Sequence, residues 1–254
     1  MATPAVRYSQ GQKDIGEARN FPWEHAVPDT RFWRDIPFTA ARNFLQNFSL
    51  DEENHLSINP DTDLSHQAKL ELLERLLRER LATKEADVAP QTLHETDYPA
   101  WERLYLAIVT MQKELGRAAE AEQTLRMMIE NRRDKTNLSF LHSLASMLLA
   151  RGEYAEAERM EREVVGWLDG RLGRGSPQAL NARRIVAEAV WKQGRRGEAE
   201  VVLKEVEGIL GEDGEMGMGG YAVYREGEVE ATEKLRRELV GVGEGEDDVG
   251  QAEV

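Results

Sequence analysis

Apolar residues between positions 100 and 210 recur with the spacing of one buried helix face, in several consecutive segments. One segment carries them at positions i, i+3, i+4 and i+7: Leu141, Leu144, Ala145 and Leu148. This spacing is typical of an amphipathic α-helix. Gly152 follows, and a second segment of the same kind begins directly after it. Because glycine readily adopts the left-handed backbone that ends many helices, the pattern predicts a hairpin of two helices.

The hairpin pattern occurs three times. Each copy has a glycine followed four to six residues later by Glu-Ala-Glu: LGRAAEAEQTL, RGEYAEAERME and QGRRGEAEVVL. Gly152 lies 36 residues after Gly116, and Gly194 lies 42 residues after Gly152. A recurrence of this length predicts stacked helical hairpins that bury a shared core. A helical bundle with accidental echoes is the alternative.

The repeated residues resemble the tetratricopeptide repeat. The matching positions are the turn glycines, a small residue in the first helix (Ala145, Ala187) and an alanine near the start of the second (Ala121, Ala157, Ala199). The segment from Leu172 to Glu200 is similar to the longer variety of kinesin light chains and fungal repeat proteins. Arg183 departs from the family, which places a large aromatic residue there. The resemblance implies an all-α, right-handed superhelical solenoid of about three hairpins with flanking capping helices.

The rest of the chain divides by composition. We expect a disordered N-terminus (1–20), an aromatic-rich segment with N-terminal capping helices (21–99), the repeat domain (100–210), a flexible linker (211–220), a C-terminal capping helix (221–240) and an acidic disordered tail (241–254).

The aromatic-rich segment concentrates Phe and Trp residues between Phe21 and Phe48. Large aromatic side chains are costly to leave in water, so the segment is expected to cap the exposed end of the solenoid. It could instead form a pocket or lie in the groove. Thr39 is the predicted N-cap of a helix through Phe48, and Ser65 starts an amphipathic helix. That helix either packs as a further solenoid helix or forms a short coiled-coil seam.

Composition excludes several classes of protein. The chain has no cysteine, which excludes disulfides and Cys-based zinc sites. The net charge is −14, with acids unaccompanied by Lys or Arg at 51–63 and 244–253, which argues against nucleic-acid binding. There is neither a signal sequence nor an apolar run long enough to span a membrane. We therefore expect a cytoplasmic protein.

No motif points to chemistry. The five histidines lack the spacing of metal ligands. Glycine-rich phosphate loops and nucleophile motifs are absent from the sequence. We therefore predict a non-enzymatic protein without cofactor or metal.

The resemblance implies a concave groove lined by the first helix of each hairpin. The implied partner-binding positions are Arg103 and Lys113 in the first hairpin, His142 in the second, and Asn181, Arg184, Glu188, Trp191 and Lys192 in the third. Four of these residues are cations on a chain that is acidic elsewhere, which suits an acidic peptide. Trp191 would anchor it.

The predicted function is therefore that of a protein–protein interaction scaffold or adaptor that holds a peptide or helix in the groove. One alternative is a structural subunit that self-associates as a homo-oligomer, through the aromatic segment or an uncapped solenoid end. Another is an enzyme or small-ligand binder with a pocket between the aromatic segment and the groove. The chain's own N-terminal segment or acidic tail could also fill the groove.

Overall fold

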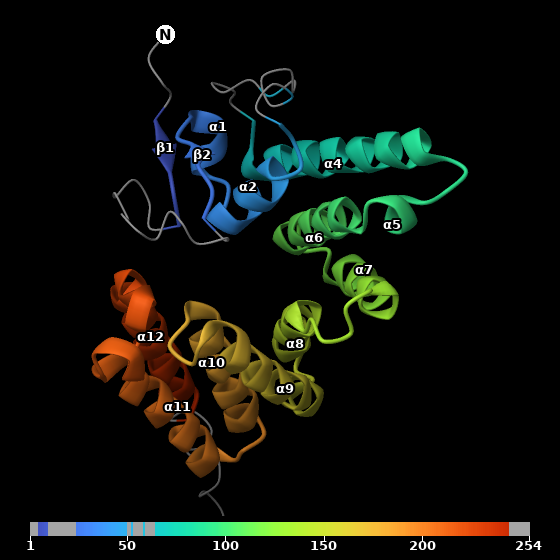
Figure 1. Ribbon diagram of the computed structural model, residues 1–254. Coiled ribbons are helices and arrows are strands. Elements are labelled where there is room, and N and C mark those ends of the chain that lie inside the picture. The colour runs from blue at the N-terminus through green and yellow to red at the C-terminus, as the bar shows by residue number, and fades with distance from the viewer. Residues whose placement is uncertain (1–4, 10–23, 50–51, 53–57, 59–63, 244–254) are drawn as a thin grey trace, which may run out of the picture. The chain divides into compact units, whose positions relative to one another are not determined.

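The computed structural model describes residues 5–9, 24–49, 52, 58 and 64–243 (Figure 1). The predictions for Phe21, Trp23 and the acidic tail beyond residue 243 lie outside the described residues. The chain forms two compact units, Met1–Arg132 and Arg133–Val254. We call them unit 1 and unit 2.

Helices make up most of the described chain, so the predicted all-α class is confirmed. Unit 1 contains β1 (Val6–Arg7), β2 (Val27–Pro28), α1 (Arg31–Arg34), α2 (Phe38–Leu45), α4 (His66–Val88), α5 (Leu93–Thr96), α6 (Tyr98–Glu114) and α7 (Ala118–Asn131). Unit 2 contains α8 (Ser139–Arg151), α9 (Tyr154–Leu172), α10 (Pro177–Lys192), α11 (Arg196–Gly211), the 3-10 helices η2 (Gly214–Met216) and η3 (Gly219–Tyr224), and α12 (Arg225–Gly243).

The three predicted hairpins are α6–α7, α8–α9 and α10–α11. Their turn glycines, Gly116, Gly152 and Gly194, have φ of 71°, 90° and 81°. In the first hairpin the amide of Gly116 donates to the carbonyl of Lys113 (3.0 Å), and that of Arg117 to Gln112 (2.8 Å). This bond pair is the Schellman motif, and the other two turns repeat it. An L-residue would be strained at these positions.

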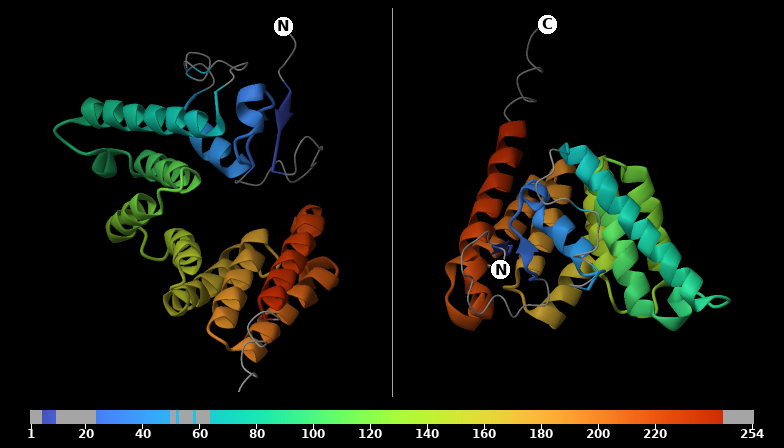
Figure 2. Two further views of the ribbon diagram at one scale, coloured as in Figure 1. Left: turned by 180° about the vertical axis from the view of Figure 1, so that it is seen from behind. Right: turned by 90° about the horizontal axis from the view of Figure 1, so that it is seen from above.

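The small alanines that predicted close helix approach are fully buried. In unit 2 each helix packs against the next, from α8 to α12, and the views of Figure 2 show them side by side in sequence order. The solenoid arrangement is thus present within unit 2, and its C-terminal member α12 packs against both α10 and α11.

In unit 1, the aromatic-rich segment packs onto the first hairpin. Phe32, Trp33 and Phe44 are buried, and neighbouring rings lie 5.0 and 5.8 Å apart between centroids. The ammonium of Lys69 on α4 is also buried and donates to Asp35 (2.8 Å) and the carbonyl of Arg31 (3.0 Å). Both α2 and α4 pack against α6.

Two local predictions for unit 1 were wrong. The helix expected to start at Thr39 begins at Phe38, with Pro37 as N-cap, because proline is compatible with a helix start but blocks its interior. Residues expected to lack structure form β1, which pairs antiparallel with β2. The guanidinium of Arg7 then donates to the carbonyls of Trp33 (2.8 Å) and Ile36 (2.5 Å). By contrast, Ser65 does cap α4, accepting from the amide of Ala68.

The predicted flexible linker is a closely packed corner. A Cβ added at Gly217 would lie 2.1 Å from the carbonyl oxygen of Glu212, and one at Gly175 would lie 2.1 Å from that of Gly217. Met218 is buried beside them. The glycines serve close backbone approach here, whereas composition alone suggested flexibility. Because η3 occupies the start of the predicted last helix, α12 begins only at Arg225.

Candidate partner-binding face

The predicted binding residues belong to two units. Arg103 and Lys113 lie on α6 in unit 1 and are exposed. Part of that α6 face is covered by the chain itself, since Asn43 on α2 donates from Nδ2 to Thr110 Oγ1 (2.9 Å). The other six residues lie on α8 and α10 of unit 2. We call the surface formed by these two first helices the α8–α10 face.

Three side chains form a hydrogen-bonded chain at the α8–α10 face. His142 Nδ1 donates to Glu161 Oε1 at 2.5 Å, and Asn181 Nδ2 lies 3.3 Å from His142 Nε2 and donates to it. The three residues come from α8, α9 and α10, so these hydrogen bonds join two neighbouring hairpins. Both ring nitrogens of His142 are engaged, which fixes the orientation of the imidazole.

This hydrogen-bonded chain runs from the protein interior to the surface. Glu161 is fully buried, and its Oε2 has no hydrogen-bond partner among the described residues. The His142 side chain is 25% exposed, and Asn181 is also partly exposed. Burial raises the pKa of the Glu161 carboxyl, and the hydrogen bond from His142 opposes that rise. Sequence reasoning identified His142 and Asn181 but missed Glu161.

Arg184 is not presented to solvent. Its guanidinium lies 2.7 Å from Glu228 on α12 and donates to Thr232 Oγ1 at 3.3 Å. The two side chains of this ion pair are only 9% and 15% exposed. A residue predicted to orient a partner therefore anchors the last helix of its own unit, because α12 packs beside α10.

The remaining predicted residues on α10 divide by exposure. Trp191 is partly buried and packs against the core cluster of Leu235 and Leu239 on α12. Lys192 is exposed. Glu188 is half-buried, and burial raises the pKa of its carboxyl; nearby Lys192 lowers that pKa, and Glu238 raises it further.

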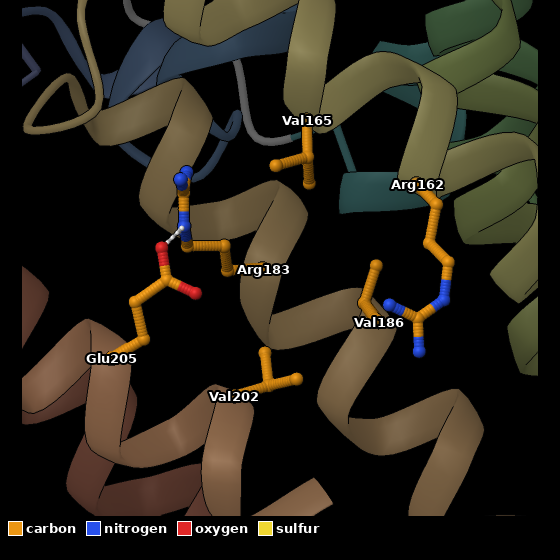
Figure 3. Close-up of a pocket in the computed structure, with 6 residues that line it drawn as sticks. All are labelled: Arg162, Val165, Arg183, Val186, Val202 and Glu205. Carbon is orange, nitrogen blue, oxygen red and sulfur yellow. Dashed lines mark hydrogen bonds and ion pairs between the residues drawn. The ribbon is translucent and has the colours of Figure 1, made fainter. Parts of the chain in front are cut away.

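A separate small cavity of about 150 Å³ lies between α9, α10 and α11 (Figure 3). Its walls are Val165, Val186 and Val202, and its rim is Arg162, Arg183 and Glu205. Arg183 pairs with Asp169 (2.7 Å) and Glu205 (2.9 Å), so its charge is neutralised. The signal for this cavity in the sequence is Arg183, which takes the place of the large aromatic residue that the repeat family has at this position.

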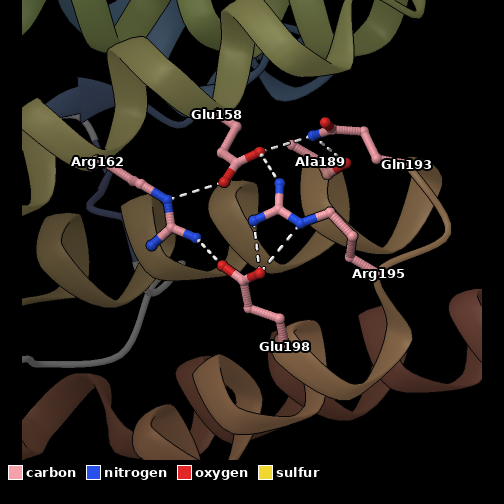
Figure 4. A network of polar contacts seen from close by, with 6 residues as sticks. All are labelled: Glu158, Arg162, Ala189, Gln193, Arg195 and Glu198. Atoms are coloured by element: carbon pink, nitrogen blue, oxygen red, sulfur yellow. Dashed lines mark hydrogen bonds and ion pairs between the residues drawn. The ribbon is translucent and has the colours of Figure 1, made fainter.

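Next to the cavity, polar side chains connect α9 and α11, the second helices of the hairpins in unit 2 (Figure 4). Glu158 accepts from Arg162 (2.9 Å), Gln193 (2.7 Å) and Arg195 (2.7 Å), and Glu198 accepts from both arginines. Each charge in this network has an opposite partner within the chain. The network is therefore a contact between the hairpins α8–α9 and α10–α11.

Residues 138–165 match the profile of the tetratricopeptide repeat family. The chain carries a tetratricopeptide repeat. The match spans α8 and most of α9, the hairpin that contains His142 and Glu161. This confirms the resemblance inferred from the sequence, and tetratricopeptide repeats generally mediate protein–protein interaction.

Similar solved structures include two forms of one protein. A kinesin light chain-like protein from Podosopora anserina with nearly identical TPR-like repeats matches with 17% identity and a TM-score of 0.48, over 69% of this chain and 87% of that one. A form of it with one substitution gives 18% identity and a TM-score of 0.48, over 68% and 86%. The search of curated protein sequences gave no match.

Among the described residues, no three His, Asp or Glu side chains lie close enough together to hold a metal ion. None of the described helices is long and apolar enough to cross a membrane.

Proposed function

We propose that the chain is a non-enzymatic adaptor whose α8–α10 face binds an extended segment of a partner protein. The observation that carries this proposal is the hydrogen-bonded chain from buried Glu161 through His142 to Asn181. It supports a binding role because it costs stability and leads to the surface where first helices of such repeats receive peptides.

Glu161 carries an energetic cost. It occupies an interior position between Met160 and Val164, where an apolar side chain would pack without a desolvation cost. One carboxylate oxygen lacks a hydrogen-bond partner in the described structure. A buried acid that is only partly hydrogen-bonded raises the free energy of the folded state, so its presence here suggests another role. Its evident effect is to hold His142, and through it Asn181, in one orientation.

The exposed end of the hydrogen-bonded chain is suited to a peptide backbone. The side-chain amide of Asn181 has two donor hydrogens and an acceptor oxygen, of which one hydrogen is directed to His142. The others can bond a backbone carbonyl and a backbone N–H of an extended segment. Such amide contacts fix the register of a peptide without depending on its sequence.

Preference for acidic segments rests on fewer residues than the sequence suggested. Arg184 is occupied by Glu228, so Lys192 is the exposed cation among the proposed residues of the α8–α10 face. In unit 1, Arg103 and Lys113 are exposed on α6, where Glu114 offsets part of the charge of Lys113. The proposed pocket between the aromatic segment and the groove stays a prediction; in unit 1, α2 lies directly against α6.

Selection of peptides from a displayed random library on the immobilised full chain tests this function. The best binders are then measured against Asn181→Ala and Lys192→Glu variants. We expect each variant to weaken binding by up to about fivefold, and Lys192→Glu to weaken acidic peptides most, since exposed charge contacts and single hydrogen bonds are worth up to about 1 kcal/mol.

The matched control is Lys204→Glu, an exposed lysine on α11 away from the face. It changes the net charge by the same amount and should leave affinity unchanged. Equal loss in Lys192→Glu and Lys204→Glu would show that only overall charge matters. Unchanged affinity in Asn181→Ala would remove the α8–α10 face from the binding site.

A further inference from the structure

One flank of α12 carries a stripe of four residues whose spacing is the same when it is read in either direction along the helix. The stripe is Val229, Glu233, Arg236 and Val240, separated by four, three and four positions. Residues at these spacings share one side of an α-helix. The pattern is apolar, acidic, basic, apolar, so a rotation by 180° exchanges each valine with the other and the acid with the base.

The α12 stripe is open to solvent and borders two hollows. Val229 is 36% exposed and Val240 is 45% exposed. One hollow, of about 340 Å³, is lined by Glu207, Leu210, Gly211, Val229, Thr232 and Glu233. The other, of about 480 Å³, is lined by Glu233, Arg236, Arg237, Val240 and Gly241. Each valine of the stripe therefore has a hollow beside it that an apolar side chain could fill.

The position of α12 in the repeat explains this open flank. In unit 2 the first helices α8 and α10 are each followed by a second helix that packs on them, α9 and α11. Like a further first helix, α12 packs against α10 and α11, but no second helix follows it within the described residues. A solenoid end of this kind leaves apolar surface that a neighbouring helix can bury.

We propose that two copies of the chain associate through this flank, with their α12 helices antiparallel about a twofold axis near residues 234 and 235. Val229 then meets Val240 of the second copy, and Glu233 meets Arg236 of the second copy. Both contacts occur twice, as in any isologous interface. The interface uses a flank of α12 outside the α8–α10 face, so it does not depend on the proposed peptide binding.

Charge favours the antiparallel arrangement over a parallel one. In a parallel pair in the same register, Glu233 would face Glu233 and Arg236 would face Arg236, and like charges in contact oppose association. Arg236 is already bound to Glu207 (2.9 Å) and Glu200 (3.0 Å) on α11, and its side chain is 33% exposed. It is thus held in place by α11 through Nε and Nη1 and remains partly open to solvent.

Disulfide trapping tests this geometry, because the natural chain has no cysteine. Val229→Cys and Val240→Cys are made separately in the full chain, and then each alone and the two mixed are oxidised. The positions lie about 16 Å apart along a helix, whereas a disulfide needs Cα atoms about 4.4–6.8 Å apart. We expect cross-linked dimer in the mixture and little in either variant alone.

The other outcomes overturn the proposal. Cross-linking of each variant with itself would indicate parallel helices. A yield in the mixture no higher than in a control of Val229→Cys with Val201→Cys, an exposed valine on α11, would indicate random collision.

The mass in solution gives a second readout. We expect sedimentation measurements over a concentration series to show a dimer of the natural chain. In Val229→Glu the dissociation constant of this dimer should rise about tenfold or more, because a charge would be buried against Val240 of the second copy. Val201→Glu should leave it unchanged. A monomeric full chain that dimerises only when residues 244–254 are removed would show that the tail occupies the flank, which also overturns the proposal.

Discussion

Replacing Glu228 with alanine removes the carboxylate that neutralises Arg184. The guanidinium would keep only the 3.3 Å hydrogen bond to Thr232 and would remain largely out of water, since its side chain is 9% exposed. Breaking a buried pair from one side costs about 3–5 kcal/mol, whereas exposed pairs contribute at most about 1 kcal/mol. Because Glu228 itself is 15% exposed, we expect the lower end, about 3 kcal/mol.

Urea unfolding followed by circular dichroism measures this cost. Glu230→Ala is the matched control: the same substitution on the same helix, at an exposed residue. It should change the free energy of unfolding by no more than about 0.5 kcal/mol. The double variant Arg184→Met, Glu228→Leu removes both charges and should return to within about 1 kcal/mol of the natural chain.

Two results would refute this reasoning. A loss below about 1 kcal/mol in Glu228→Ala would mean that solvent screens the pair. A double variant as unstable as the single one would mean that packing, not the unpaired charge, sets the cost. Arg184→Glu is unsuitable as a test of partner binding, because it would place a second carboxylate beside Glu228 and so destabilise unit 2 itself.

Two other substitutions test the packed corner and the buried acid. Gly217→Ala should destabilise unit 2 by about 2–3 kcal/mol, because the new Cβ would lie 2.1 Å from a backbone oxygen. The control Gly220→Ala should be nearly neutral, because no atom lies within 4 Å of its Cβ. Equal urea midpoints for the two variants would contradict the close packing at Gly217. The raised pKa of Glu161 means that the folded chain binds this proton more tightly than the unfolded chain, so its contribution to stability falls as the pH rises through and above the ordinary value of 4.5. Glu161→Gln should remove that part of the decline, which is measured as the dependence of the unfolding midpoint on pH. If this dependence is the same in the variant and in the natural chain, Glu161 does not titrate as described.

The repeat itself was predictable because its signals are local. The turn glycines, the buried alanines and the Ser65 cap each act within a few residues, through backbone conformation or the approach of adjacent helices. The corner at Gly217 was not predictable, because the atoms that crowd it belong to Glu212 and Ile209 in the folded chain. Nothing in a glycine-rich stretch distinguishes close approach from flexibility.

The candidate site was only partly predictable. Family positions placed His142 and Asn181 on first helices, and the structure brings them into contact. Glu161 was missed although a signal existed: it lies four residues after Ala157 and three before Val164, within the apolar stripe of α9. Arg184 was misjudged because its partner lies 44 residues later in the chain, a distance that periodicity does not bridge.

The polar network between α9 and α11 has a consequence for how unit 2 loses its structure. Its arginines are 42–45% exposed, so dissolved ions screen and weaken it, whereas the apolar contacts within each hairpin are not weakened by screening. In a linear array of repeats, cooperativity depends on the coupling between neighbours. Raising the ionic strength therefore lowers this coupling more than the intrinsic stability of either hairpin. Because α9 and α10 also share the buried apolar cluster of Val164, Leu168, Ala179 and Ala182, unit 2 should still unfold as one body, but over a broader range of denaturant than at low ionic strength.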